Sequence, residues 1–338
     1  MPTQKGCVII STQPLNIRDC ADKFVRMDQA RITPIPLVDV VRPTTFIEAR
    51  RLSLELGAEV VLASETFQHT GSFKFRAAYN VASNVPQKSI ITASSGNFGQ
   101  AMACACSMLG KTITVVMPAT SAKVKIDAVR EYGGVVDLID TSRISRAERV
   151  AELAHAHPEA YIASAYDDPL VIEGNASLGR ELVNSGRRFE TVVAPVGGGG
   201  LTSGIVTAVR AAGAQVKVVG AEPALANDAA RSLRSGHIVI NESEPQTIAD
   251  GTRTVSLGRH NWEILREGLD TIVEIPEDAI KEAVRLLFRL ANLKAEPTGA
   301  LSVAALLAAP ERFRGVKVCC VISGGNVDPD VYLRIMAE

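Results

Sequence analysis

Lys74 is the residue whose surroundings point most clearly to chemistry. It lies in Thr70–Arg76 (TGSFKFR), between an expected strand, Glu59–Ala63, and an expected helix, Phe75–Ala82. A Gly-Ser turn that holds a lysine against apolar neighbours removes water from its amine, and desolvation lowers the pKa of an ammonium group. The deprotonated amine is a nucleophile that forms Schiff bases with carbonyl groups. A solvated surface lysine is the alternative, and the neighbouring motifs argue against it.

The four glycines at 197–200 form a second chemical feature. They follow the apolar run Thr191–Val196 and precede a helical pattern, Leu201–Arg210. Glycine lets a ligand approach the backbone closely, and free N–H groups at a helix start attract anions, so the segment is predicted to bind a phosphate. A nucleotide-binding loop is the alternative, but the GK[ST] ending of a P-loop is missing and Glu222 is the only hint of a dinucleotide site.

Polar residues follow two further apolar runs. Ser94–Gln100 lies between Ile90–Ala93 and a helix expected over Ala101–Leu109. Its Ser, Asn and backbone amides suit a carboxylate, whereas simple N-capping would need only one such residue. Ser323 follows Val318–Ile322, and a hydroxyl at a strand end can either hydrogen-bond a ring nitrogen or form a turn.

These segments together resemble one enzyme family. GSFKFRAA, SSGNFGQA, VGGGGLTSG and CVISGGN are similar, in this order, to segments of the fold-type II pyridoxal phosphate (PLP) enzymes, and within them to the serine/threonine dehydratase and serine racemase group. EPTGA and TIADGTRT also resemble family segments. The resemblance extends from about Thr33 to Asn326, which is nearly the whole chain.

The resemblance implies a PLP site and assigns roles within it. Lys74 would hold PLP through a Schiff base and remove the α-proton of the substrate, with Ser95 as a second catalytic group. The four glycines would bind the phosphate, Asn97 the ring hydroxyl and Ser323 the pyridine nitrogen. The residues expected around the cofactor are Lys74, Phe73, Asn97, Gly197, Gly198, Gly199, Gly200, Leu201, Glu296 and Ser323. Those expected around the substrate are Ser94, Ser95, Asn97, Phe98 and Gln100.

Such a site predicts PLP-dependent deamination of a β-hydroxy amino acid, such as serine, threonine or a relative, to a 2-oxo acid and ammonia. The hydroxyl of Ser323 is neutral and does not protonate the ring, which favours rapid loss of the β-hydroxyl. A serine-type racemase is the first alternative, with Ser95 as its second acid/base. A β-replacement synthase comes next, although those families usually read Lys-Asp where this chain has Lys74-Phe75. A binding module without chemistry is disfavoured by the intact lysine, phosphate loop and serine.

Two features concern specificity and metal binding. Phe98 stands where the family commonly has His, so the carboxylate loop is less polar and the substrate is expected to differ from plain serine or threonine. Glu222, the Ala226 carbonyl and Asp228 resemble the family's divalent-cation segment, and oxygen ligands suit Mg²⁺ or Ca²⁺. The alternative, that the two acids are solvated or pair with nearby arginines, stays open.

The composition agrees with a small-molecule enzyme. The chain has 338 residues, 46% of them hydrophobic, and a formal net charge of −1. The near-zero charge argues against nucleic acid and membrane partners. No apolar run reaches transmembrane length, Met1–Asp19 lacks a signal pattern, and the six cysteines have no metal-like spacing, so we expect a cytoplasmic protein with reduced thiols. The family implies a homodimer that takes a small amino-acid substrate.

Strand and helix patterns alternate along the chain. Apolar strands between helices predict an α/β fold with parallel-rich sheets covered by helices. The family implies the two-lobed, tryptophan-synthase-β-like arrangement, with a large PLP-binding domain (1–88 plus 167–338) and a small inserted domain (89–166). Further strands are expected at Ile113–Met117, Val135–Ile139, Val216–Gly220 and Val316–Ile322. Further helices are expected at Phe46–Leu56, from Ser121 to Tyr132, at Ser145–Ala156, from Pro169, and from Pro276 to about Asn292.

Overall fold

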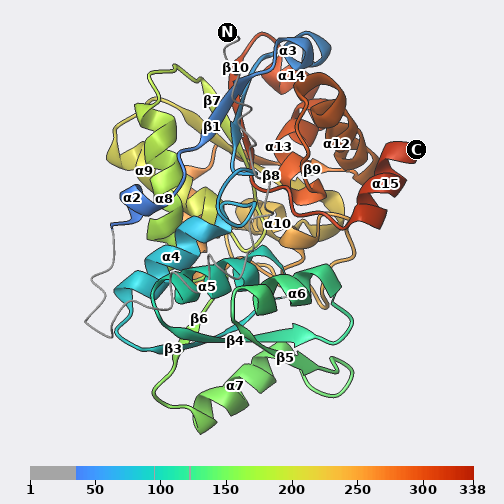
Figure 1. Ribbon diagram of the computed structural model, residues 1–338. Coiled ribbons are helices and arrows are strands. Elements are labelled where there is room, and N and C mark those ends of the chain that lie inside the picture. The colour runs from blue at the N-terminus through green and yellow to red at the C-terminus, as the bar shows by residue number, and fades with distance from the viewer. Residues whose placement is uncertain (1–35, 95, 122) are drawn as a thin grey trace, which may run out of the picture. The chain divides into compact units, whose positions relative to one another are not determined.

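Two β-sheets organise the part of the chain that the computed structural model describes, residues 36–94, 96–121 and 123–338 (Figure 1). One sheet has the strand order β1-β2-β10-β7-β8-β9, and the other has the order β5-β4-β3-β6. Every neighbouring pair is parallel except β1 and β2. The strands are β1 (Thr45–Glu48), β2 (Glu59–Ser64), β3 (Ser89–Ala93), β4 (Thr112–Pro118), β5 (Val135–Ile139), β6 (Tyr161–Ala163), β7 (Thr191–Pro195), β8 (Lys217–Pro223), β9 (Thr271–Ile275) and β10 (Lys317–Ile322).

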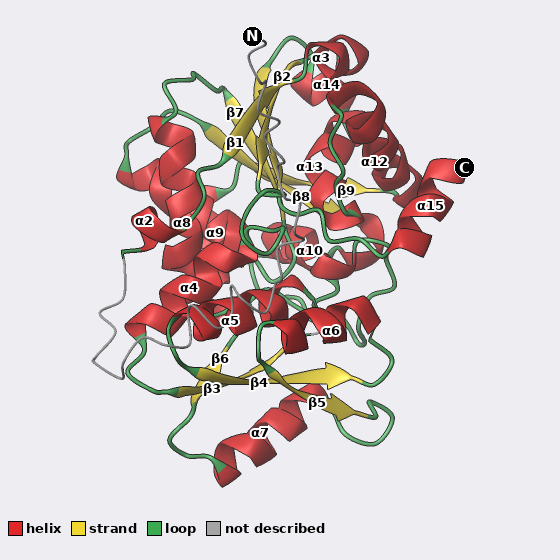
Figure 2. Ribbon diagram, in the orientation of Figure 1, coloured by secondary structure: helices red, strands yellow, loops and turns green. Residues whose placement is uncertain are grey.

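Helices connect successive strands and cover the sheets, as parallel pairing requires (Figure 2). In the four-stranded sheet, α5 and α6 lie on one face and α7 on the other. The helices are α2 (Leu37–Val40), α3 (Arg50–Leu56), α4 (Lys74–Asn84), α5 (Asn97–Met108), α6 (Lys123–Glu131), α7 (Arg146–Ala156), α8 (Pro169–Asn184), α9 (Gly200–Ala211), η1 (Ala224–Ala226), α10 (Asp228–Ser235), η2 (Asp250–Thr252), α11 (Arg259–Gly268), α12 (Glu277–Ala291), α13 (Pro297–Ala308), α14 (Pro310–Phe313) and α15 (Pro329–Ala337).

The central strands of the larger sheet are apolar along their whole length because both faces are covered. Val318–Ile322 of β10 is fully buried, and α13 packs against β7, β8, β9 and β10 on one face. On the other face α9 packs against β7 and β8. The continuous apolar runs of the sequence therefore correspond to doubly covered parallel strands, and the predicted α/β fold is confirmed.

Most predicted elements occur within a few residues of their expected bounds, and two of the predicted helices begin at a capping side chain. Ser145 forms a capping box with Glu148, and the carboxylate of Asp168 accepts from the Leu170 amide directly before Pro169. The helix predicted over Phe46–Leu56 is wrong in its first part.

Thr45–Glu48 is instead strand β1, antiparallel to β2, and α3 begins only at Arg50. Phe46 pairs with Ala63, and Ile47 with Leu62, at the edge of the sheet. Sheet pairing with a distant segment overrides the local helical pattern, and a single sequence does not reveal that pairing.

The predicted division into domains, 1–88 plus 167–338 and 89–166, stays a prediction. The strands of the smaller sheet fall between Ser89 and Ala163. Within the described ranges, no helix combines the length and apolarity needed to cross a bilayer.

The parallel register decides where the chemical residues meet. In the order β2-β10-β7, three parallel neighbours end on the same edge. Lys74 follows β2, Ser323 follows β10 and Gly197 follows β7. Ligands of parallel α/β sheets bind at this carboxyl edge, so residues far apart in sequence are brought to one place.

Candidate active site

A cavity of about 1310 Å³ opens at the carboxyl ends of strands from both sheets. From the larger sheet it is lined by Lys74, Ser323 and the glycine loop; from the smaller sheet, by the segments after β3, β4 and β6. Of the residues predicted around cofactor and substrate, the lining includes Phe73, Lys74, Ser94, Asn97, Phe98, Gly197, Gly198, Gly199, Gly200, Leu201, Glu296 and Ser323.

Lys74 is the first residue of α4 and is partly buried. Its Nζ donates to the Ala165 carbonyl at 2.8 Å and lies 5.1 Å from the centre of the Phe73 ring and 5.5 Å from that of Phe98. Burial lowers the pKa of Lys74 from 10.5 to about 8, although the carboxylate of Glu296 opposes this. The amine is thus available as a nucleophile and base near neutral pH.

The turn before Lys74 is fixed to the segment that carries Ser323. The Phe73 amide donates to the Ser323 carbonyl at 2.9 Å, and the Gly325 amide to the Gly71 carbonyl at 3.0 Å. Asn326 Nδ2 adds a bond of 2.7 Å to the Thr70 carbonyl. The Lys74 amine and the Ser323 hydroxyl, which is predicted to bind the nitrogen of the cofactor ring, are therefore carried by one rigid backbone unit.

The lowered pKa of Lys74 gives a pH prediction. After removal of bound cofactor, the rate at which the protein covalently captures added PLP should rise about tenfold per pH unit and level off near pH 8, because only the free amine reacts. Stopped-flow absorbance between pH 6 and 10 measures this rate, with Lys74→Ala as the blank. A rate still rising above pH 9.5 would show an ordinary lysine.

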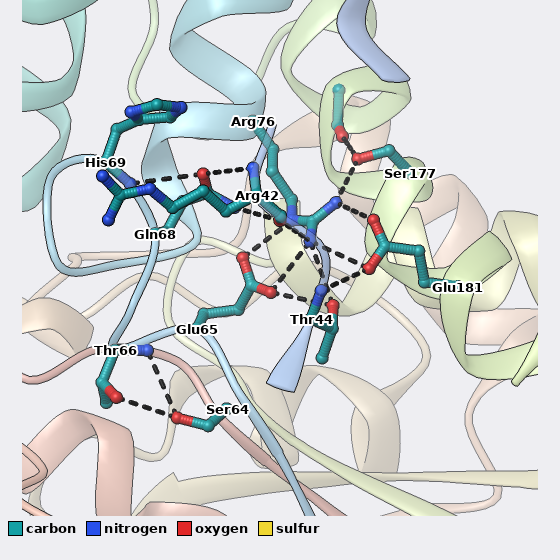
Figure 3. A network of polar contacts seen from close by, with 11 residues as sticks. Arg42, Thr44, Ser64, Glu65, Thr66, Gln68, His69, Arg76, Ser177 and Glu181 are labelled. Carbon is teal, nitrogen blue, oxygen red and sulfur yellow. Dashed lines mark hydrogen bonds and ion pairs between the residues drawn. The ribbon is translucent and has the colours of Figure 1, made fainter. Parts of the chain in front are cut away.

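Arg76 anchors α4 two residues beyond Lys74 (Figure 3). Its guanidinium is fully buried and donates Nε to Glu65 Oε2 at 2.7 Å and Nη2 to Glu65 Oε1 at 2.9 Å. Nη1 donates to Glu181 at 2.7 Å and to Ser177 at 3.0 Å, and Nη2 to Thr44 at 3.0 Å. One cation thus joins the residue before β1, α4, α8 and the loop after β2, which fixes the first turn of α4.

The glycine loop presents free backbone donors. Among the described residues, the amides of Gly197, Gly198 and Gly199 donate no hydrogen bond to another backbone group. The first amides of α9 have no partner within the helix. Gly199 has a φ of +97°, which favours glycine. A Cβ on Gly198 would lie 2.2 Å from the ring of Tyr166, so no larger residue fits there. The loop suits a phosphate dianion.

Ser323 supplies a second sign of an absent ligand. Its side chain is 1% exposed, and its Oγ has no hydrogen-bond partner among the described residues although it lines the cavity. A buried hydroxyl without a partner costs stability, so a ligand acceptor is expected beside it. The lysine, the unpartnered hydroxyl and the free amides together fit PLP.

The predicted partner of the ring hydroxyl, Asn97, belongs to a polar chain. Its Nδ2 donates to Glu296 Oε1 at 2.8 Å, and its Oδ1 accepts from Asn326 Nδ2 at 2.9 Å. Burial raises the pKa of the Glu296 carboxyl. These hydrogen bonds orient the Asn97 side chain at the cavity wall. The contact of Asn97 with a ring hydroxyl stays a prediction.

The predicted carboxylate loop is placed only in part. Ser94 Oγ accepts from the Gly96 and Gly99 amides, so it shapes the start of α5. Phe98 is 1% exposed and covers the Lys74 amine. Gln100 lies on α5 outside the cavity lining, and Ser95 lies outside the described residues. The roles given to these residues stay predictions.

The acidic pair lies outside this cavity. Both oxygens of the fully buried Glu222 accept from backbone amides, those of Ala229 at 3.0 Å and Ala230 at 2.9 Å. Asp228 Oδ1 accepts from Asn241, whereas its buried Oδ2 has no hydrogen-bond partner among the described residues. Burial and the charge of Asp228 raise the pKa of Glu222, and burial raises that of Asp228 to about 6.

This pair alone does not form a complete metal site. Within the described ranges, no group of three or more His, Cys, Asp and Glu side chains is arranged to hold an ion. Carbonyls and water would have to complete the coordination of a cation here.

Sequence reasoning missed several residues that shape the cavity. Tyr166 covers Gly198, and the Ala165 carbonyl holds the amine of Lys74. Asn326 ends a recognised motif, and Arg76 is inside another, but neither motif reveals which partners they bind. Only the fold brings these partners together.

Comparisons with known proteins agree with the geometry. Residues 37–324 match the family described as pyridoxal-phosphate dependent enzyme. The chain is 35% identical over 297 residues to the L-threo-3-hydroxyaspartate ammonia-lyase of Pseudomonas sp, covering 87% of this chain and 92% of that protein. It is 35% identical over 321 residues to the serine racemase of Homo sapiens, covering 91% and 93%. A crystal structure of threonine deaminase from T.th. superposes with a TM-score of 0.80 at 39% identity, covering 86% and 95%.

Proposed function

The chain belongs to the family of pyridoxal-phosphate-dependent enzymes, and from this premise we propose that it deaminates a β-hydroxy amino acid to a 2-oxo acid and ammonia. The observation that carries the proposal is the Lys74 amine, which is partly buried, has a lowered pKa and shares one cavity with the free amides of the glycine loop and the unpartnered Ser323 hydroxyl. The relatives named ammonia-lyase and deaminase support the same reaction class.

Each residue of the site has its own role in the proposed reaction. Lys74 holds the cofactor and then moves the proton at the α-carbon of the substrate. The glycine loop binds the phosphate of the cofactor, and Ser323 binds its ring nitrogen. PLP, when bound, supplies the electron sink for the charge that develops at the α-carbon. The amides at the start of α5, with Ser94 and Ser95, are the groups that we assign to the α-carboxylate.

The protein favours loss of the β-hydroxyl in two ways. The Ser323 hydroxyl is neutral, so it can hydrogen-bond the cofactor ring but does not protonate it. The negative charge that develops at the α-carbon is then stabilised less strongly, which favours rapid loss of the β-hydroxyl. Once it has taken the α-proton, the ammonium of Lys74 is an acid that can give this proton to the departing hydroxide, which leaves as water. Hydrolysis of the dehydrated product then gives one 2-oxo acid and one ammonia per substrate.

The substrate class follows from the relatives and from Phe98. We propose a β-hydroxy amino acid other than plain serine, with threo-3-hydroxyaspartate as the first candidate, because the hydroxyaspartate lyase is among the similar proteins. Phe98 leaves the carboxylate loop without the imidazole that we expect in the family, so its polar contacts differ.

The test is an assay of 2-oxo acid and ammonia with threo-3-hydroxyaspartate, threonine and serine. Aspartate is the matched control, because it lacks only the leaving hydroxyl and should give no 2-oxo acid. Equal amounts of 2-oxo acid and ammonia are expected from threo-3-hydroxyaspartate or threonine, and release from serine alone would contradict the proposed substrate class. No release from any of the three, with PLP bound, would contradict the proposal.

A racemase is the second candidate, because human serine racemase is among the similar proteins. Racemisation needs an acid on the face of the substrate opposite Lys74, and Ser95, which is predicted for this role, lies outside the described residues. Chiral chromatography of the same reactions separates the two functions. Inversion of the α-carbon much faster than ammonia release would replace the lyase proposal with a racemase.

We also propose that a divalent cation, Mg²⁺ or Ca²⁺, binds at Glu222, the Ala226 carbonyl and Asp228. The unpartnered Oδ2 of Asp228 and the mutual repulsion of two buried carboxylates support it. A cation that binds only the folded chain raises its stability by RT ln(1 + [L]/Kd).

The melting temperature should therefore rise with the logarithm of cation concentration, and Glu222→Gln should lose this response. The exposed Glu173→Gln is the control and should keep it. An unchanged melting temperature in Mg²⁺ and Ca²⁺, or a normal response of Glu222→Gln, would show that Glu222 only caps α10 and binds no cation.

The assembly and the location of the protein complete the proposal. We propose a cytoplasmic homodimer with two domains, 1–88 plus 167–338 and 89–166. Sedimentation equilibrium would distinguish the dimer from a monomer, and limited proteolysis would show whether cleavage concentrates near 88 and 167.

A further inference from the structure

A fully buried side chain behind the glycine loop, Asn261, connects three segments that are distant in sequence. It is the third residue of α11 and lies outside the lining of the cavity. Its Nδ2 donates to the Gly198 carbonyl at 2.8 Å and to the Tyr166 carbonyl at 2.9 Å. The glycine loop, the segment after β6 and the start of α11 therefore meet at one amide group.

The orientation of this amide is fixed by its partners. Both partners are carbonyl oxygens, which only accept, so the NH₂ group and not the oxygen must face them. The Gly258 amide also donates to the Gly198 carbonyl, at 3.1 Å. With two donors, both lone pairs of this carbonyl are occupied, and its direction is set.

The direction of the Gly198 carbonyl decides where the next amide points. The Gly198–Gly199 peptide is planar and trans, so its C=O and the N–H of Gly199 point in opposite directions. Because the carbonyl points at Asn261 behind the loop, the Gly199 N–H points away from α11, toward the side on which the glycines line the cavity.

The start of α11 is itself held firmly. Asp167 accepts from the Arg259 amide at 3.0 Å and from the His260 amide at 2.9 Å, which caps the helix. Asn261 thus reaches the loop from a fixed base, and the Cβ that a larger residue at Gly199 would carry lies 2.8 Å from Asn261 Cβ. Gly199 is therefore packed against Asn261 so closely that only glycine fits at this position.

We propose that Asn261 is a positioning residue for the cofactor phosphate: by binding the Gly198 carbonyl, it turns the loop amides toward the phosphate. It acts through the loop and does not touch the cofactor. The proposal rests on the assignment of PLP as cofactor, but not on which amino acid is the substrate.

The test compares PLP with pyridoxal, which has the same ring and aldehyde but no phosphate. Cofactor is removed with hydroxylamine, and the dissociation constants of both compounds are measured by absorbance titration for wild type and Asn261→Ala. PLP affinity should fall about 10- to 100-fold, because two hydrogen bonds are lost, while pyridoxal affinity should change less than about threefold.

Two further variants keep the test decisive. Asn261→Asp keeps the shape, suits the N-terminal turn of α11, and places an acceptor against two carbonyls, so it should show the same selective loss if the alanine variant folds poorly. Asn175→Ala is the control, because Asn175 is also fully buried but its side chain has no hydrogen-bond partner among the described residues. It should leave both affinities unchanged.

The outcomes are distinct. A parallel loss of PLP and pyridoxal affinity in both Asn261 variants would show a merely structural residue, and unchanged PLP affinity would show that the loop does not need Asn261. Either result would overturn the proposal. If wild type itself fails to bind PLP, the cofactor assignment is wrong, and the proposal is wrong with it.

Discussion

Replacing Lys74 with alanine is expected to reduce turnover by at least about 10³-fold, because one amine both holds the cofactor and moves the α-proton. The loss should appear in kcat, since the glycine loop and Ser323 remain to bind PLP and the cavity remains to bind substrate. Steady-state release of 2-oxo acid, measured with saturating PLP, gives the effect.

Lys125→Ala is the matched control for this substitution. Lys125 lines the same cavity but pairs with Asp250, and we give it no role in the reaction. Its turnover should stay within about tenfold of wild type. Turnover of Lys74→Ala at a similar level would show that another group removes the proton.

Replacing Arg76 with methionine should lower the free energy of unfolding by about 3–5 kcal/mol, the usual cost of removing one partner from a buried ion pair. Glu65 is 1% exposed and would keep a carboxylate without its cation. Although burial opposes it, the guanidinium of Arg76 lowers the pKa of Glu181, so this second carboxylate also depends on Arg76. Urea denaturation monitored by circular dichroism measures the change.

Arg180→Met provides the comparison on the surface of α8. Arg180 and Glu173 are 49% and 56% exposed, and an exposed pair contributes at most about 1 kcal/mol. Arg76→Lys keeps the charge but loses the two-pronged contact with Glu65, so its loss should be intermediate. Equal stability of Arg76→Met and Arg180→Met would show that the buried network contributes little.

The parts of the site that local motifs determine can be predicted from the sequence. Lys74, Ser323 and the glycine loop each follow an apolar strand, and a strand followed by a helix start is readable from the order of residues. The residue types there also restrict the ligand, because free amides at a helix start favour a phosphate. The parallel α/β fold follows from the same alternation of apolar strands and helices.

The missing parts depend on contacts between distant segments. Asn261 lies 63 positions from Gly198, and Glu181 lies 105 positions from Arg76, so no local pattern connects them. The strand at Thr45–Glu48 has a helical pattern of its own, and its pairing with β2 cannot be seen in its residues. The resemblance of the motif predicts Gln100 beside the substrate, whereas its position on helix α5 puts it outside the cavity lining.

The central claim is that PLP is attached to Lys74 in this cavity. Purified protein should be yellow, and reduction with borohydride should fix the cofactor to a single residue that peptide mass spectrometry can identify. We predict one phosphopyridoxyl group per chain, on the peptide that contains Lys74. A label on any other lysine, including Lys125 and Lys281 of the same cavity, or on no lysine after PLP has been added, would contradict the account.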